Sequence, residues 1–89
     1  MMDPQTQLES LLSLLSRLGV EVRRERLGGT GGGLCRLRGQ RVFFLDLDLD
    51  RAGQLEAGVA AVAVFPEVDR LYLTPALREQ VDRARGPAT

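Results

Sequence analysis

The sequence contains no histidine, lysine or tryptophan, and Cys35 is its only cysteine. A histidine-paired serine or cysteine nucleophile, a lysine Schiff base and a histidine-bound metal are therefore excluded for this chain acting alone. A single cysteine also excludes a disulfide within the chain. We therefore expect a protein that is not an enzyme and that has no metal and no cofactor.

Isoleucine and asparagine are absent as well, whereas arginine, alanine, glycine, leucine and valine are abundant. This combination is typical of a GC-rich genome and indicates a bacterial source. All twelve basic residues are arginine, and codon supply explains that choice better than selection for phosphate binding. Aromatic residues make up only 4% of the chain, so the core must consist mainly of leucine, valine and alanine.

The length of 89 residues suffices for one domain, which we expect to span residues 1–89. The longest apolar run without a charge, residues 57–65, is too short to cross a bilayer. The first residues include Asp3 and no basic side chain before Arg17, which is unlike a secretory signal. These observations predict a cytoplasmic location.

The first of three predicted helices begins either at Asp3 and Pro4 or at a capping box in residues 6–9, and it ends near Gly19. Its leucines recur at helical spacing and form one apolar stripe. The stripe could cover the sheet or contact a second copy of the chain. Its members are Leu8, Leu11, Leu15 and Leu18.

The second helix is predicted to start after Asp48 or Asp50 and to end near Phe65, where Pro66 blocks continuation. Thr74, followed by proline, predicts the start of a third helix that ends at the Gly-Pro pair of residues 86–87. Between these helices, residues 71–73 form a short extended segment.

Strands are predicted in three segments, residues 20–27, 34–38 and 41–47. Charged side chains mark the first as an edge strand. The other two flank Gly39 and Gln40, which suits a two-residue hairpin turn. In that register Cys35 lies opposite Phe44 on an apolar side facing the core, although a slip of one residue would invert both faces. The expected fold class is therefore α+β. Its elements, in chain order, are a helix, a three-stranded antiparallel sheet, a helix, a short extended segment and a C-terminal helix, and the helices cover one face of the sheet.

Half of the ten glycines lie between the first two predicted strands. A phosphate-binding loop would need a lysine and a following helix, and neither is present here. We interpret the segment as a mobile connection, and weak anion binding by exposed backbone N–H groups stays open. The glycines are Gly28, Gly29, Gly31, Gly32 and Gly33.

Asp46, Asp48 and Asp50 alternate with leucine in a pattern that resembles the opening of a calcium loop. An EF-hand would require glycine at position 51 and glutamate at position 57, where this chain has Arg51 and Ala57. Alternate residues of a strand also project about 7 Å apart instead of converging on one ion. We therefore interpret the three aspartates as a solvated strand edge followed by a helix cap.

Charge is segregated along the chain. Residues 17–41 contain seven arginines and two glutamates, whereas residues 42–69 contain one arginine and six acidic residues. The strands could therefore present a basic face with Phe43 for base stacking, or the arginines could form an ordinary solvated face. The same segregation favours self-association or a charged protein partner. The candidate basic residues are Arg23, Arg36, Arg38 and Arg41.

Cys35 precedes Arg36, a cation that favours a reactive thiolate. Free cysteine is nevertheless among the most buried residue types, and the predicted register turns Cys35 inward. Core packing is therefore the preferred interpretation, and a thiol enzyme or redox protein that uses Cys35 is an alternative.

The sequence carries two resemblances to known proteins. The stretch of residues 31–39, with residues 42–46 and 72–75, resembles a group of small bacterial proteins of unknown function. That resemblance covers most of the chain and implies no activity and no site residue. A hairpin leading into a helix also resembles the start of zinc-protease domains related to bacterial regulator-cleaving enzymes, but residues 55–61 lack the histidines of their His-Glu-x-x-His motif.

We therefore expect a non-enzymatic cytoplasmic interaction module that forms a homodimer or binds a protein partner, and that does not bind membranes. Binding of RNA or single-stranded DNA through the arginine-bearing sheet face is the first alternative.

Overall fold

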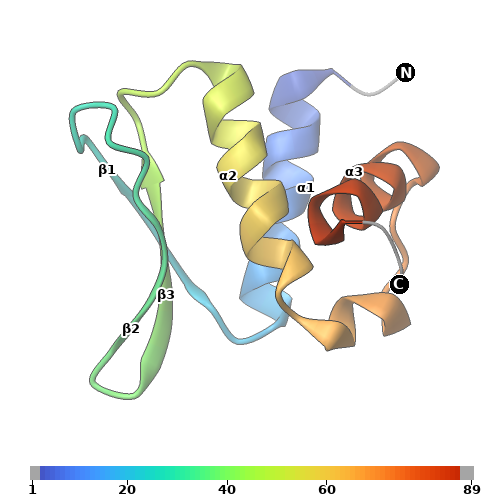
Figure 1. The fold of residues 1–89 in the computed structure, drawn as a ribbon. Coiled ribbons are helices and arrows are strands. Elements are labelled where there is room, and N and C mark those ends of the chain that lie inside the picture. The colour runs from blue at the N-terminus through green and yellow to red at the C-terminus, as the bar shows by residue number, and fades with distance from the viewer. Residues whose placement is uncertain (1–2, 87–89) are drawn as a thin grey trace.

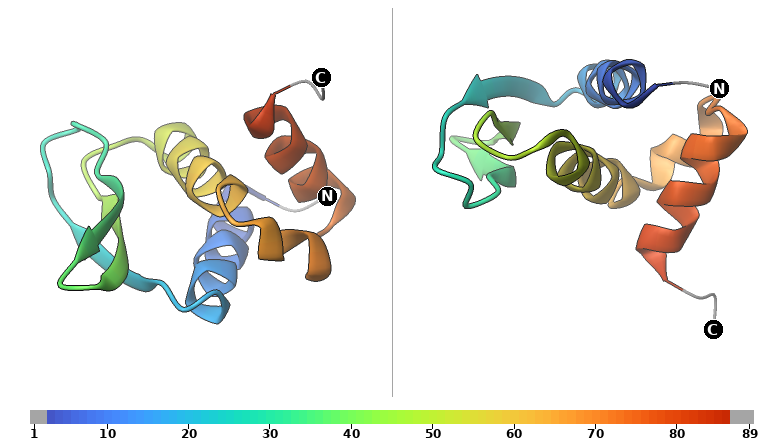
Figure 2. Two further views of the ribbon diagram at one scale, coloured as in Figure 1. Left: turned by 60° about the horizontal axis from the view of Figure 1, so that its bottom comes forward. Right: turned by 90° about the horizontal axis from the view of Figure 1, so that it is seen from above.

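The computed structural model describes residues 3–86. Its elements are α1 (Pro4–Arg17), β1 (Glu21–Glu25), β2 (Gly33–Leu37), β3 (Gln40–Asp46), α2 (Arg51–Ala63), the 3-10 helix η1 (Pro66–Arg70) and α3 (Pro75–Arg85). This is the predicted α+β order, with η1 as an addition. Figures 1 and 2 show three layers: the sheet, then α1 and α2 side by side, then α3 on the far side.

Side-chain caps decide where the helices begin. The carboxylate of Asp3 accepts a hydrogen bond from the N–H of Thr6 (2.7 Å), so α1 begins at the first of its two predicted starts. Asp50 caps α2 and Thr74 caps α3 in the same manner. For α1 and α2 the structure thus uses one of the two starts that the sequence left open, and for α3 it uses the predicted cap.

The sheet is mixed, with strand order β1-β3-β2, and this corrects the all-antiparallel prediction. β3 pairs antiparallel with β2 but parallel with β1. The reason is the connection formed by residues 26–32, which crosses the end of β3 and lets β3 lie between β1 and β2. β1 is an edge strand, as its charged side chains predict.

The hairpin turn lies one residue earlier than predicted. Its central residues are Arg38 and Gly39, which both have positive φ (52° and 80°), as the turn type favoured by strand twist requires. The resulting register pairs Leu37 with Gln40 and Cys35 with Val42. The prediction that Cys35 lies opposite Phe44 on the core side is therefore wrong.

The core lies between the sheet and α3, and it is built around α1 and α2. Leu11 packs against Gly58 of α2, where a Cβ would lie 3.3 Å from the Leu11 Cδ1 atom. The prediction that this leucine stripe contacts a second copy of the chain is therefore wrong, because the leucines pack in the chain's own core. Leu8, Leu11 and Leu15 are buried there, and Leu18 is partly buried. Within residues 3–86, no helix has the length and apolar content needed to cross a membrane.

Candidate functional site

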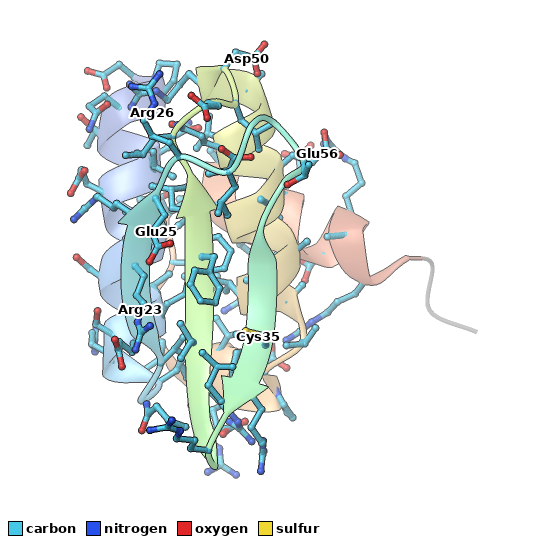
Figure 3. All side chains as sticks on the ribbon, turned by 90° about the vertical axis from the view of Figure 1, so that its left-hand side faces the viewer. Arg23, Glu25, Arg26, Cys35, Asp50 and Glu56 are labelled. Carbon is cyan, nitrogen blue, oxygen red and sulfur yellow. The ribbon has the colours of Figure 1, made fainter. Side chains whose placement is uncertain are left out.

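The outer face of the sheet, on the side away from α1 and α2, is covered by no helix among the described residues (Figures 1 and 3). The register places Cys35, Val42 and Phe44 on this face, together with Arg23 of β1. Figure 3 shows Arg23 and Cys35 on the outer face, on opposite sides of β3, with Glu25 next to Arg23. Cys35 is exposed, so its predicted burial is wrong. The structure thus brings a thiol and apolar side chains together on an open face.

The predicted basic face does not form, because its members lie on different sides of the sheet. Arg36 and Arg41 lie opposite each other on β2 and β3, on the side that faces the helices. Arg23 lies on the outer face and Arg38 lies in the turn. Phe43, the predicted stacking residue, is fully buried in the core. The shift of the turn removes Arg38 from the strand, and the face that carries Arg36 and Arg41 packs toward the helices with Phe43, whereas Arg23 lies beside Phe44 on the other face.

Arg23 and Arg41 are instead used within the molecule. The guanidinium of Arg41 lies 5.0 Å from the centre of the Phe65 ring, and that of Arg23 lies 5.9 Å from the centre of the Phe44 ring. Arg23 also donates to Glu21 at 2.6 Å, and this hydrogen bond raises the pKa of Arg23 above its ordinary value. These two arginines therefore have partners of their own.

The two edges of the sheet differ in their protection. Four of the five residues of β1 are charged, whereas β2 has one charged residue, Arg36, and also contains the exposed Cys35 and Leu37. The side chain of Leu37 is 42% exposed. Charged side chains hinder the pairing of an edge strand with another chain, so β2 is the unguarded edge.

Asp46, at the C-terminal end of β3, holds the glycine segment in place. Its carboxylate accepts hydrogen bonds from the N–H groups of Leu27 (3.1 Å) and Gly31 (3.0 Å). The N–H of Asp48 adds a third bond to it at 2.9 Å, and the carboxylate of Asp48 accepts one from Gly28 at 2.8 Å. The segment does bind carboxylates through its backbone, but they belong to the chain itself. The predicted external anion site therefore loses the donors of Gly28 and Gly31.

The buried Asp46 is only 1% exposed, which corrects its interpretation as part of a solvated edge. Desolvation raises the pKa of Asp46, but the N–H donors, led by Gly31, outweigh it and bring the pKa below the ordinary value of 3.8. Asp46 is therefore ionised at neutral pH. Its charge fixes residues 26–32 over the end of β3.

Shallow grooves flank β2 on both sides. On the outer side, Leu27, Gly33, Cys35 and Phe44 line a groove of about 250 Å³, which also includes Gly32 and Leu34. A second groove of about 310 Å³ lies at the same edge and extends to α2 and η1, with residues Val64, Phe65 and Glu67. No groups of three or more His, Cys, Asp or Glu side chains that could hold a metal ion occur within residues 3–86.

A further groove, which the sequence did not indicate, lies on the opposite side of the molecule, between α1 and the segment that precedes α3. It has a volume of about 400 Å³, and Ser10, Ser13 and Tyr72 line it. The Tyr72 side chain is 81% exposed there. Only tertiary packing brings residues so distant in the sequence together, so no local pattern could have indicated this groove.

No known protein family, curated protein or solved structure matches this chain. The resemblances noted for the sequence therefore contribute no activity, ligand or site residue, and the open sheet is the feature that bears most directly on function.

Proposed function

We propose that the protein is a non-enzymatic interaction module that self-associates through the open side of its sheet. The open side consists of the outer face of the sheet and the free edge of β2. The observation that carries the proposal is the contrast between the charged edge of β1 and the unguarded edge of β2. An edge strand with exposed Leu37 and Cys35 beside it is a natural site for pairing with another chain.

The distribution of charge supports a protein partner over a nucleic acid. Arginines of the predicted basic region lie beside acidic side chains: Arg23 pairs with Glu21, Arg24 with Glu9 and Arg26 with Asp48. Phosphate binding requires a concentration of unneutralised positive charge, and these pairs reduce it. A surface with both signs of charge suits contact with a second copy of the same surface.

Sedimentation equilibrium under reducing conditions tests this proposal. We expect the wild-type chain to approach twice the monomer mass as its concentration rises. The Leu37→Asp variant should remain monomeric, because it places a charge at the apolar edge. Tyr72→Asp is the matched control, since it alters an even more exposed apolar side chain outside the open side and should still dimerise. A wild-type protein that stays monomeric at every accessible concentration would contradict the proposed function.

A further inference from the structure

We infer that two copies pair their β2 strands antiparallel about a twofold axis at Cys35, which joins the two sheets into one sheet of six strands. This inference rests on the proposed function and specifies its partner and register. It follows from which backbone groups of β2 point toward the free edge, from a groove beside Gly33, and from the charged side chains of Arg36 and Glu56.

The hydrogen-bonding phase identifies which backbone groups of β2 are free. Pairs alternate along an antiparallel ladder, and the pair that closes a two-residue turn, here Leu37 with Gln40, is hydrogen-bonded. Cys35 therefore directs its N–H and C=O groups toward β3, as Leu37 does. Leu34 and Arg36, the intervening residues, direct theirs toward the free edge.

The free groups select one twofold register. With the axis at Cys35, Leu34 of each copy lies opposite Arg36 of the other, and each such pair exchanges both N–H···O bonds. An axis at Arg36 would place two arginines directly opposite each other, which is unfavourable. An axis at Leu34 would require Gly32 to pair, although Gly32 lies in the crossing segment against the Phe44 carbonyl. The axis at Cys35 uses the whole of β2.

The side chains fit this register as well. Leu37 of one copy then lies opposite Gly33 of the other, and both positions are on the outer face. A Cβ at Gly33 would meet no atom within 4 Å, and the groove of about 250 Å³ beside it is lined by Leu27 and Phe44. The exposed Leu37 side chain of one copy can therefore enter an apolar groove of the other.

The charges on this flank are complementary under the same axis. Arg36 lies near the hairpin end of β2. Glu56 lies in the first half of α2, where it also lines a groove between α2 and α3, and α2 runs from the Gly33 end toward the hairpin end (Figure 3). Neither side chain has an ion pair within residues 3–86. A twofold axis brings the Gly33 end of one copy beside the hairpin end of the other. It therefore moves each Glu56 toward the other copy's Arg36.

Oxidation of Cys35 tests the position of the axis. In this register the two Cys35 residues form a non-hydrogen-bonded pair with Cα atoms about 4.5 Å apart, within the range of a disulfide. Oxidised glutathione, a small-molecule disulfide, accepts two electrons and is released as two thiols, while the Cys35 thiols lose two protons and join. We expect the dilute folded protein to become a covalent dimer on non-reducing gels. Accumulation of a mixed disulfide with glutathione and no dimer would overturn the register.

The double variant Arg23→Cys with Cys35→Ser is the control for this experiment. It moves the thiol to β1 on the same outer face. The two β1 strands would be five strand spacings apart in the joined sheet, about 24 Å, so this variant should not crosslink. Crosslinking of the variant would indicate that the outer faces stack on each other, which contradicts pairing at the β2 edge.

Proline at position 36 tests the backbone pairing independently. Arg36→Pro removes an N–H that points away from β3, so the monomer should keep its circular dichroism spectrum. The dimer should weaken by about tenfold or more, because each copy loses a hydrogen bond to the other. Arg36→Ala keeps the N–H and should weaken it far less. Equal dimerisation of both variants, with wild-type protein still dimeric, would refute the register and leave the proposed function standing. A monomeric wild type would refute both.

Discussion

At the scale of single residues, the Asp46 carboxylate holds the segment that connects β1 and β2. It is buried at the point where the chain leaves β3, and it accepts hydrogen bonds from both sides of the crossing segment, at Leu27 and Gly31. No ion pair involves Asp46 within residues 3–86, so this buried carboxylate depends on backbone donors for its stability. Glycine is suited to supply such donors because it reaches positive φ without strain, as Gly31 does at 107°.

This residue gives the protein a defined acid sensitivity. Because the pKa of Asp46 is lowered on folding, its contribution to stability is complete above the ordinary value of 3.8 and is lost as pH falls through the lower folded pKa. Asp46→Asn should therefore lower the free energy of unfolding at neutral pH. Below about pH 4, the free energy of unfolding should decrease less steeply with falling pH in the variant than in the wild type. The slope should not vanish, since the pKa of Asp3 and that of Asp69 are also lowered.

Urea unfolding at a series of pH values measures this effect. Asp82→Asn is the matched control, because Asp82 is exposed and has no ion pair within residues 3–86. The control should unfold like the wild type at each pH. Equal pH profiles for Asp46→Asn and the wild type would show that the carboxylate does not hold the crossing segment.

At the level of elements, the connections depend on a few long-range contacts. Arg85, in the last turn of α3, donates from Nε to the carbonyl of Ala63 and from Nη2 to that of Phe65, both at 3.0 Å. Its Nη1 atom binds Asp69 of η1 at 2.8 Å, and this hydrogen bond is the main reason that the pKa of Asp69 is lowered. The last turn of α2 has no basic residue of its own, so a residue of α3 binds the carbonyls at its C-terminal end.

The crossing segment can be tested with two glycine substitutions. Gly29 and Gly32 both have positive φ, so alanine at either position costs about 1–2 kcal/mol in backbone strain. Only at Gly32 would the new Cβ also collide with the carbonyl oxygen of Phe44. We expect Gly32→Ala to cost roughly a further 1–3 kcal/mol of unfolding free energy. Equal unfolding midpoints for the two variants in urea would argue against close contact between the segment and β3.

For the molecule as a whole, α1 and α2 form the layer on which everything else packs. The sheet lies on one side of this layer, and α3 with η1 lies on the other (Figure 2). Leu11, which has no exposed surface, packs against Gly58 in the contact between the two central helices. Because both outer layers depend on this one, we expect the protein to unfold in a single cooperative transition.

Leu11→Ala tests this central layer. Truncation of a fully buried leucine leaves a cavity and should lower the free energy of unfolding by about 2–5 kcal/mol. Tyr72→Ala, which changes an exposed side chain, should stay within about 0.5 kcal/mol of the wild type. Urea unfolding followed by circular dichroism measures both changes. An unchanged free energy of unfolding for Leu11→Ala would show that the α1–α2 contact contributes little to the stability of the fold.

The sequence predicts the parts of the fold that local physics determines. The caps at Asp50 and Thr74 and the helical periodicity of α1 depend on residues a few positions apart, and these predictions are confirmed. Parallel pairing of β1 with β3 depends on a crossing held by Asp46, whose donors in the crossing segment, Leu27 and Gly31, lie 15 or more residues earlier in the sequence. No local pattern contains that information.

The candidate site was less accessible to sequence reasoning, because it depends on which face of the hairpin packs on the helices. A turn centred on Gly39 and Gln40, as predicted, places Cys35 opposite Phe44 in the core. The observed turn puts Arg38 at positive φ and sets Cys35 opposite Val42 on the outer face. Cys35 shares a face with Val42 and Phe44 in both registers, and it is exposed because the other face, with Phe43 and Leu45, packs on the helices. The cue that could have indicated the observed turn is Gly39, which suits the second central position of such a turn.

The charged side chains of β1 also limit how far the sheet can grow. An interface that uses the same β2 edge in each copy leaves β1 at both outer margins of the joined sheet, and four of the five residues of β1 are charged. A third copy would have to pair with a β1 edge, and the charged side chains of β1 oppose such pairing. The assembly should therefore stop at two chains instead of extending into a fibril, and concentrated solutions should not bind thioflavin T.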